Sequence, residues 1–200
     1  MHKKAIAEQI RQQEIDDVEY EQERAWHIDL DKLSDVFKPC KVPDELVKLA
    51  KYQNKKASFV MNPLNLVDNG NEYGNVEPLK WFASTGVGSG IAYWVKKDIE
   101  NSPIVYINHD VEGSQVLARN IRELYGLIIS GPTVGKTERK LELLFLDLKI
   151  LSDSKPEYNN LKQWMKRNIS IEPAKNPDEM IAQAKSEFGN FERWILKNGL

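Results

Sequence analysis

The sequence contains little cysteine and histidine, the residue types that most often build disulfides and metal sites. Cys40 is the one cysteine among 200 residues, so no disulfide can form within the chain. The three histidines, His2, His27 and His109, are too far apart for a helical HxxxH pair and lack the cysteines of a structural zinc site. We therefore expect no metal site.

Positive charge and long apolar runs are also scarce. Lys and Arg number 28 against 30 Asp and Glu, which gives a formal net charge of −2 and a pI of about 6.0. Because no basic excess is available to neutralise phosphates, we predict no nucleic-acid partner. No apolar run reaches the roughly 18 to 20 residues of a membrane span, and the first residues lack the apolar region of a secretory signal. We expect a cytoplasmic protein without membrane contact.

Length and composition are those of an ordinary globular protein. At roughly 150 residues per domain, 200 residues favour one core with an appendage. Hydrophobic residues make up 41% of the chain and charged residues 29%, which lies near the average for folded domains. We divide the chain into an arm over 1–40, a core over 41–130 and an extension over 131–200.

The N-terminal segment is acidic. Residues 1–35 hold ten acidic and five basic residues. The stretch from Lys3 to Arg24 contains no Gly or Pro and favours a helix, although its apolar positions lose the helical spacing after Ile10. We predict an acidic helical arm over residues 1–40, which is either a solvated face or a helix that binds a partner.

The core region begins as a helix and continues as strands. Pro43, followed by two acidic residues, favours a helix start. Short runs rich in β-forming residues then predict strands near 58–61, 79–83, 91–95 and 104–107. A long polar loop is expected over 62–75, and the glycines of 86–90 predict a hairpin turn.

After Gly113 the apolar spacing becomes helical again. Four apolar residues are spaced 4, 3 and 4 apart and predict one helix: Leu117, Ile121, Leu124 and Ile128. Further helices are expected over 141–151, after Pro156 and from Asn176 to Ile195. The predicted fold class is α+β: a central, mainly antiparallel sheet flanked by helices, with an N-terminal acidic helix and a C-terminal helical extension packed on the core.

Three sequence segments could form a cofactor-binding or catalytic site, but their spacing or context does not match the motifs of such sites. Gly131–Thr137 resembles a phosphate-binding P-loop, yet three residues separate its glycines where the P-loop has four. Gly86–Gly90 precedes a strand pattern, whereas the dinucleotide fingerprint requires a helix. His109 beside Asp110 fits turn chemistry as well as a general acid or base. We assign no catalytic residue and no cofactor.

The central block resembles a known superfamily. Its segments run in the order of an apolar strand, a small-and-glycine turn, a second strand, a Val-Tyr strand and an Ala-x-Asn-apolar-x-Glu-Leu stretch: Trp81–Gly88, Ala92–Trp94, Pro103–Tyr106 and Val116–Leu124. This order resembles the SUKH superfamily, which includes bacterial immunity proteins and fungal cell-wall glucan synthesis regulators. Val42–Leu46 is similar to the upstream family helix, while Gln53–Lys55 stands where the family commonly has an Asn-Gly-Gly turn.

The resemblance covers about residues 40–130 and implies a helix-covered antiparallel sheet with a binding role and no catalysis. The first hypothesis is an immunity protein that neutralises a cognate toxin, often a nuclease in this superfamily, by protein–protein binding. The second is a hydrolase or nucleotide-dependent enzyme that uses Gly131–Thr137 or His109. The third is a regulatory scaffold similar to the cell-wall synthesis regulators.

Candidate partner-binding residues are those in predicted loops at the strand ends, where a basic toxin surface could dock: Asp68, Glu72, Tyr73, Asp98 and Asp110. Loops carry recognition because a rigid sheet positions them. An aromatic side chain is the expected energetic anchor, and acidic side chains are expected to speed association with a basic partner. The alternative interpretation is that all five are solvated turn residues.

Overall fold

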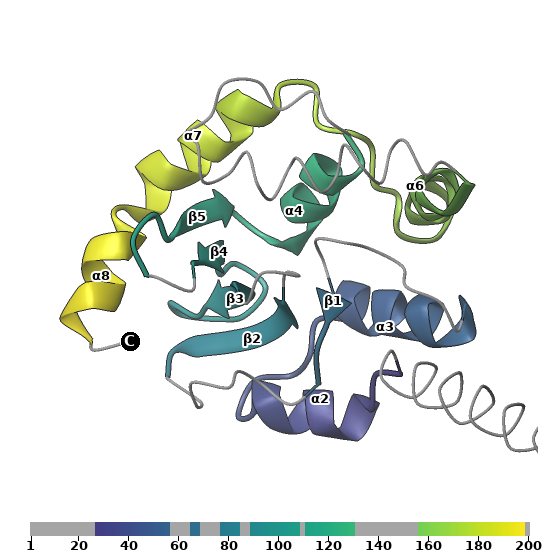
Figure 1. Ribbon diagram of the computed structural model, residues 1–200, viewed down its shortest axis with the longest axis horizontal. Coiled ribbons are helices and arrows are strands. Elements are labelled where there is room, and N and C mark those ends of the chain that lie inside the picture. The colour runs from purple at the N-terminus through teal and green to yellow at the C-terminus, as the bar shows by residue number, and fades with distance from the viewer. Residues whose placement is uncertain are drawn as a thin grey trace, which may run out of the picture.

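A single sheet lies at the centre of the molecule. The computed structural model describes residues 27–56, 65–68, 77–84, 89–108, 111–130 and 156–198. Five strands follow one another in the order β1-β2-β3-β4-β5, and every neighbouring pair is antiparallel. Their bounds are Asn65–Leu66 (β1), Leu79–Ser84 (β2), Gly90–Trp94 (β3), Ile104–Ile107 (β4) and Gln115–Ala118 (β5). Figure 1 shows the strands stacked with helices around them, which confirms the predicted α+β class.

Both faces of this sheet are buried. Successive residues of β3 alternate between two apolar clusters: Ile91 and Tyr93 belong to one, and Ala92 and Trp94 to the other. This is the alternation that the pleat of a strand imposes. All residues of β3, β4 and β5 are buried, so helices must cover the sheet on both sides.

The first face is covered by four helices. They are α2 (Leu30–Phe37), α3 (Asp44–Lys56), α4 (Ile121–Ile128) and α6 (Pro156–Ile169). Their core side chains join one cluster with Tyr93, and include Phe37, Leu46, Leu124 and Leu161. In Figure 1, α2 lies beneath β2 and α3 lies beside β1.

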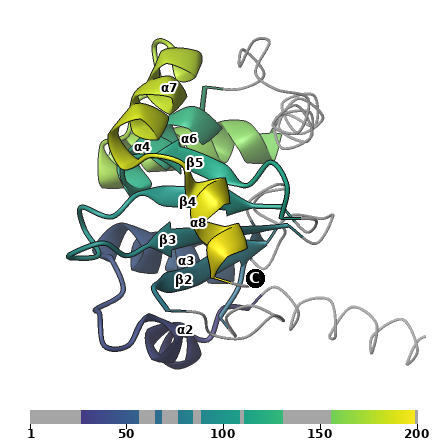
Figure 2. The same ribbon diagram turned by 90° about the vertical axis from the view of Figure 1, so that its left-hand side faces the viewer.

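The second face is covered by α7 (Pro177–Phe188) and α8 (Phe191–Lys197). Ala184, Phe191 and Ile195 pack there with Trp94 and its neighbours. The Trp94 and Phe191 ring centroids are 4.9 Å apart in an edge-on arrangement, which aromatic pairs favour. Figure 2 shows α8 in front of the strands and α3 behind them.

A buried lysine links the sheet to α2. Lys80 in β2 is only 4% exposed. Its ammonium group donates to the Lys38 carbonyl, at 2.6 Å, and forms an ion pair with Glu77. A buried charge must be paired in this way, so Lys80 fixes the end of α2 against β2.

Several predicted elements agree with the structure. The strands near 79–83, 91–95 and 104–107 are β2, β3 and β4, and the helix expected at Pro43 is α3. The helix expected after Pro156 is α6. The start at Asn176 is also confirmed, because its side chain accepts from the Glu179 amide and Pro177 follows as the first helical residue.

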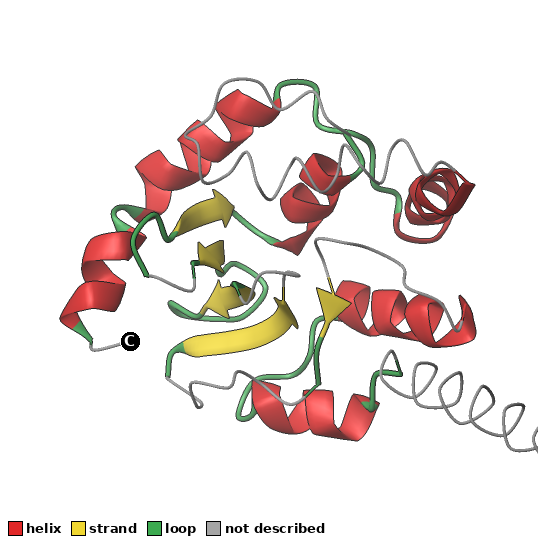
Figure 3. Cartoon of the chain, in the orientation of Figure 1, coloured by secondary structure: helices red, strands yellow, loops and turns green. Residues whose placement is uncertain are grey.

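Three predictions about secondary structure were wrong, as Figure 3 makes visible. Leu117 lies in strand β5, so the helix predicted to begin after Gly113 begins only at Ile121. The segment 62–75, predicted as a continuous loop, contains the two-residue strand β1.

The third wrong prediction is the single helix from Asn176 to Ile195. It is two helices, because Gly189 adopts a φ of 80° and the Asn190 side chain caps a new helix by accepting from the Arg193 amide.

Other predictions fall on residues outside the described part of the chain. They are the helix over Lys3–Arg24, the strand near 58–61, the helix over 141–151 and most of the glycine turn at 86–90. The hairpin that this turn was expected to close is present, since β2 pairs with β3 in antiparallel register. Helix α2 lies within the range of the predicted helical arm over 1–40, but no separate helix had been predicted at these residues.

Gly90 provides a test of how tightly this hairpin packs. A Cβ atom at Gly90 would lie 1.9 Å from Cζ3 of the Trp81 ring, and that ring is only 5% exposed. Because the ring has no free space to move into, we expect Gly90→Ala to lower the free energy of unfolding by about 3 kcal/mol. Urea denaturation monitored by circular dichroism measures the change.

The matched control uses the smaller side chain in Trp81→Leu. In that background the alanine at position 90 should cost much less, because the colliding ring atoms are gone. An equal loss in both backgrounds would show that the ring contact is not the cause.

Candidate functional site

The turn between β3 and β4, residues 95–103, is charged and is held by side-chain hydrogen bonds. Asp98 and Glu100 are both exposed. Asp98 Oδ1 accepts from the backbone N–H and from the side-chain amide of Asn101, each at 2.9 Å. Ser102 Oγ donates to the Asp98 carbonyl. Such bonds hold a turn in one conformation.

The same turn is anchored to the sheet at its base. The Trp94 N–H donates to the Pro103 carbonyl at 2.9 Å, which closes the ends of β3 and β4. Ile99 is 8% exposed and belongs to the first-face core. The exposed carboxylates are therefore presented by a backbone that the core holds in place.

A cavity of about 440 Å³ lies beside this turn. Residues 41–45, Lys48 and residues 120–122 form its walls at the starts of α3 and α4, and Ile99 and Glu100 contribute from the turn. Tyr93 of β3 completes the lining. The volume falls within the range of small-molecule sites. We call the 95–103 turn and this cavity together the turn–cavity surface.

The charged residues of the cavity are balanced in number. Three are cationic and three are anionic: Lys41, Lys48, Arg122, Asp44, Glu45 and Glu100. Arg122 Nη1 lies 3.1 Å from Glu45 Oε1, and Arg122 Nη2 donates to the Ser170 carbonyl at 3.1 Å. The guanidinium is therefore fixed between α3 and the chain that follows α6.

A second ion pair lies at the rim. Lys41 Nζ and Asp44 Oδ1 are 2.9 Å apart. This hydrogen bond raises the pKa of Lys41 and lowers the pKa of Asp44, so both groups stay charged near neutral pH. Both side chains are largely exposed, and such a pair contributes little to folding stability.

Tyr93 is the buried polar residue of the cavity wall. Its side chain is packed between Phe37 and Phe82, whose ring centroids lie 5.7 and 5.3 Å away. The residue is 1% exposed, and its hydroxyl has no hydrogen-bond partner among the described residues. Burial raises the pKa of Tyr93 well above its usual value, and the charge of nearby Glu45 adds to the shift. The hydroxyl is therefore protonated at neutral pH.

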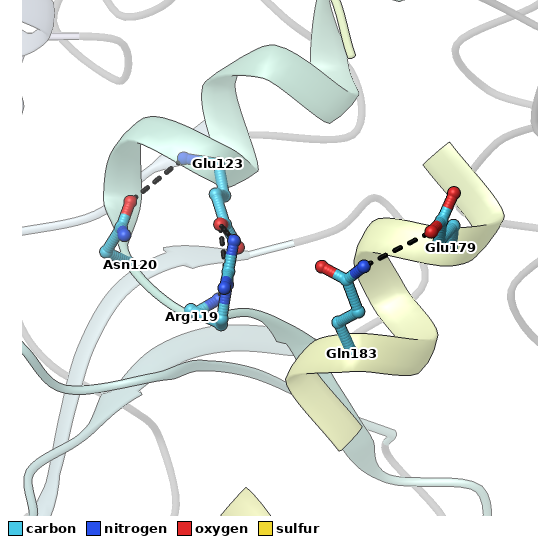
Figure 4. A network of polar contacts seen from close by, with 5 residues as sticks. All are labelled: Arg119, Asn120, Glu123, Glu179 and Gln183. Atoms are coloured by element: carbon cyan, nitrogen blue, oxygen red, sulfur yellow. Dashed lines mark hydrogen bonds and ion pairs between the residues drawn. The ribbon is translucent and has the colours of Figure 1, made fainter. Parts of the chain in front are cut away.

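The start of α4, which forms one cavity wall, is rigidly capped (Figure 4). Asn120 Oδ1 accepts from the Glu123 N–H at 3.0 Å, and the Glu123 carboxylate accepts from the Arg119 N–H at 3.0 Å. The pair resembles a capping box, except that the Glu123 carboxylate reaches the N–H of the residue before the Asn120 cap. The Arg119 side chain also pairs with Glu123, so α4 begins at a fixed position next to the cavity.

Another cavity, of about 380 Å³, lies where α7 meets α8 and β5 begins. Gly113, Lys185 and Glu192 are among its lining residues. The Gly113 N–H donates to Glu192 Oε1 at 2.6 Å, so this carboxylate already has a structural partner. The turn–cavity surface brings together more charged groups and is the stronger candidate.

Two of the five predicted site residues fall within the described part of the chain, and the structure does not bring them together. Asp68 follows β1 and accepts from the Asp29 N–H at 2.6 Å, where α2 begins. Asp98 stabilises the β3–β4 turn. Glu72, Tyr73 and Asp110 lie outside the described residues, as do His109 and the Gly131–Thr137 loop.

The sequence reasoning missed Tyr93, Arg122 and Glu45 as site residues. Tyr93 had been assigned to a strand, and Glu45 to a helix start. Residues 45, 93 and 122 are far apart in sequence, and only the packing of α3 and α4 on the sheet brings them together. The sequence signal that could have indicated this site was the pair of helix starts at Pro43 and Asn120, which lie before and after the strands in the sequence.

Two further classes of site are absent from the described residues. No group of three or more His, Cys, Asp or Glu side chains there is arranged to hold a metal ion. No helix in the same ranges is long and apolar enough to cross a membrane.

Comparison with family models, with curated proteins and with solved structures finds no match for this chain. The functional conclusion must therefore come from the residues and their geometry.

The contribution of the Asn120 cap to the stability of α4 can be tested by substitution. Asn120→Ala removes the acceptor for the Glu123 N–H, so we expect the free energy of unfolding to fall by about 1 kcal/mol. Asn120→Asp keeps an acceptor at the same place and should retain the wild-type stability. Urea denaturation of the two variants measures the difference, and an aspartate variant as unstable as the alanine variant would contradict the assigned cap.

Proposed function

We propose that this chain is a non-catalytic binding protein that neutralises a protein toxin in the cytoplasm by direct docking. The observation that carries the proposal is the 95–103 turn, which presents exposed charged groups on a backbone held by hydrogen bonds. The helix-covered antiparallel sheet supports it, because the SUKH resemblance of residues 40–130 implies that fold.

A pre-ordered turn suits protein binding for a thermodynamic reason. Association with another protein loses affinity when loops and side chains must be ordered at the interface. In the 95–103 turn much of this ordering is already present in the free protein, since Asp98, Asn101 and Ser102 bond to one another. A partner that docks here loses less conformational entropy than one that docks on an unstructured loop.

The charges of the turn indicate what kind of partner it would favour. The turn holds two exposed carboxylates, Asp98 and Glu100, and two exposed ammonium groups, Lys96 and Lys97, so it has no formal net charge. The two carboxylates are the groups proposed to pair with basic side chains of a partner such as a nuclease toxin and to speed the diffusional encounter. Asp68 follows β1 and is not part of this turn; its carboxylate accepts from the Asp29 N–H.

The test is the double variant Asp98→Asn with Glu100→Gln, studied with a cognate toxin that is first sought among the products of neighbouring genes. Asparagine can still accept the hydrogen bonds from Asn101, so the variant removes charge and keeps the turn. We expect the association rate to fall about threefold to tenfold at low salt, and its salt dependence to weaken. Stopped-flow or surface plasmon resonance kinetics measure both quantities.

A matched control removes two exposed acids on α7, in Asp178→Asn with Glu187→Gln. This control should associate at close to the wild-type rate. An equal slowing in both variants would show that only net charge matters and would remove the turn from the proposal. If co-expression gives no protection from the toxin and no complex is recovered, toxin neutralisation is wrong.

A further inference from the structure

A stripe of lysines on α3 has no counter-charge within the described part of the chain. Lys48, Lys51 and Lys55 are exposed and lie three and four residues apart, which places them on one side of the helix. None of the three forms an ion pair with a described residue. The acids of α3, Asp44 and Glu45, lie in its first turn and are already paired. Because like charges at this spacing repel one another, the stripe favours an anionic neighbour.

The lysine stripe runs beside an aromatic contact between α3 and α6. The rings of Tyr52 and Trp164 are stacked with their centroids 4.5 Å apart, and both side chains are partly buried. Tyr52 lies three residues before Lys55 and therefore borders the stripe. Arg167, one turn after Trp164, is exposed and forms no ion pair with a described residue. Figure 2 shows both helices behind the strands. We call these five residues the basic seam: Lys51, Tyr52, Lys55, Trp164 and Arg167.

The chain enters its described part next to the basic seam. The Ile28 N–H donates to Asn54 Oδ1, and the Asn54 side-chain amide donates to the Ile28 carbonyl, each at 2.8 Å. Asn54 directly precedes Lys55 and lies about one helical turn after Lys51. The residues that precede Ile28 in the sequence are therefore tethered at the end of α3 that carries these lysines.

The sequence just before this tether is strongly acidic. Residues 14–23 hold six acidic residues and no basic one. Ile15, Val18 and Tyr20 supply apolar side chains between the acids. An extended chain covers at most about 3.6 Å per residue, so residue 23 lies within about 18 Å of Ile28. The acidic run is thus opposite in charge to the lysines, carries apolar groups that suit the two aromatic rings, and starts within reach of both.

We propose that residues 14–23 dock on the basic seam of their own chain, with their acids against the cations of α3 and α6 and their apolar side chains over the Tyr52–Trp164 pair. A tether of a few residues gives an effective concentration on the order of millimolar, so ion pairs too weak to join separate molecules can hold this contact. The docked run covers the seam against other anionic molecules. The contact uses no residue of the 95–103 turn, so it stands or falls separately from toxin binding.

The test is paramagnetic relaxation enhancement in the full chain. Cys40→Ser removes the native thiol, and Gln13→Cys places a nitroxide label at the end of the acidic run that is farther from the tether. At an ionic strength of about 0.01 M, where the Debye length is about 30 Å, amide signals of residues 51–55 and 164–168 should lose most of their intensity. At about 1 M, where the Debye length is about 3 Å, these signals should recover.

Removal of the cations of the seam should abolish the effect. In the labelled protein with Lys51→Gln, Lys55→Gln and Arg167→Gln, the same signals should keep their intensity at low ionic strength. All three side chains are exposed, so the variant is expected to fold. Unchanged amide signals of β3 and β4 check that it does.

The matched control removes three exposed cations from the β3–β4 turn and α8, in Lys97→Gln with Arg193→Gln and Lys197→Gln. It changes the net charge by the same amount and should show the same loss of intensity as the labelled parent protein. A mixture of spin-labelled protein and ¹⁵N-labelled protein without a spin label should show no loss, because the contact lies within one chain.

Three results would each overturn the proposal. The first is full intensity of residues 164–168 at low ionic strength. The second is an equal response of the seam variant and the control, which would show that the specific cations do not matter. The third is a loss of intensity in the mixture as large as in the labelled chain, which would show that the acidic run docks on a second copy.

Discussion

The burial of both faces of one antiparallel sheet is the constraint on which the rest of the structure depends. Ile91 and Tyr93 point to one face and Ala92 and Trp94 to the other, and all four are buried. Helices must therefore cover both sides, and the charged groups gather at the ends of the strands. The turn–cavity surface lies at such an end, where β3 leaves the sheet and α3 and α4 begin.

Local patterns in the sequence account for the elements that were predicted correctly. Strands β2, β3 and β4 follow from their β-forming residues, and α7 begins where Asn176 and Pro177 indicate. Strand β5 was missed because Leu117 matches the helical spacing of the residues after it, whereas a strand buried on both faces need not alternate. The sequence signal for helix α2 was overlooked. Asp29 is a favourable N-cap residue, and the apolar residues after it, Leu33, Val36 and Phe37, are spaced as on one face of a helix.

The candidate site could be predicted only in part. Asp98 was identified as a loop acid, and the structure adds that its carboxylate also stabilises the turn. The cavity beside it could not be predicted, because Glu45, Tyr93 and Arg122 meet only through long-range packing.

The most direct measurement is hydrogen–deuterium exchange of the protein, alone and in complex with a cognate toxin. If the turn–cavity surface is the docking site, amides of residues 96–102 and of the first turns of α3 and α4 should exchange more slowly in the complex. Protection confined to α7 and α8, or no protection at all, would contradict the account.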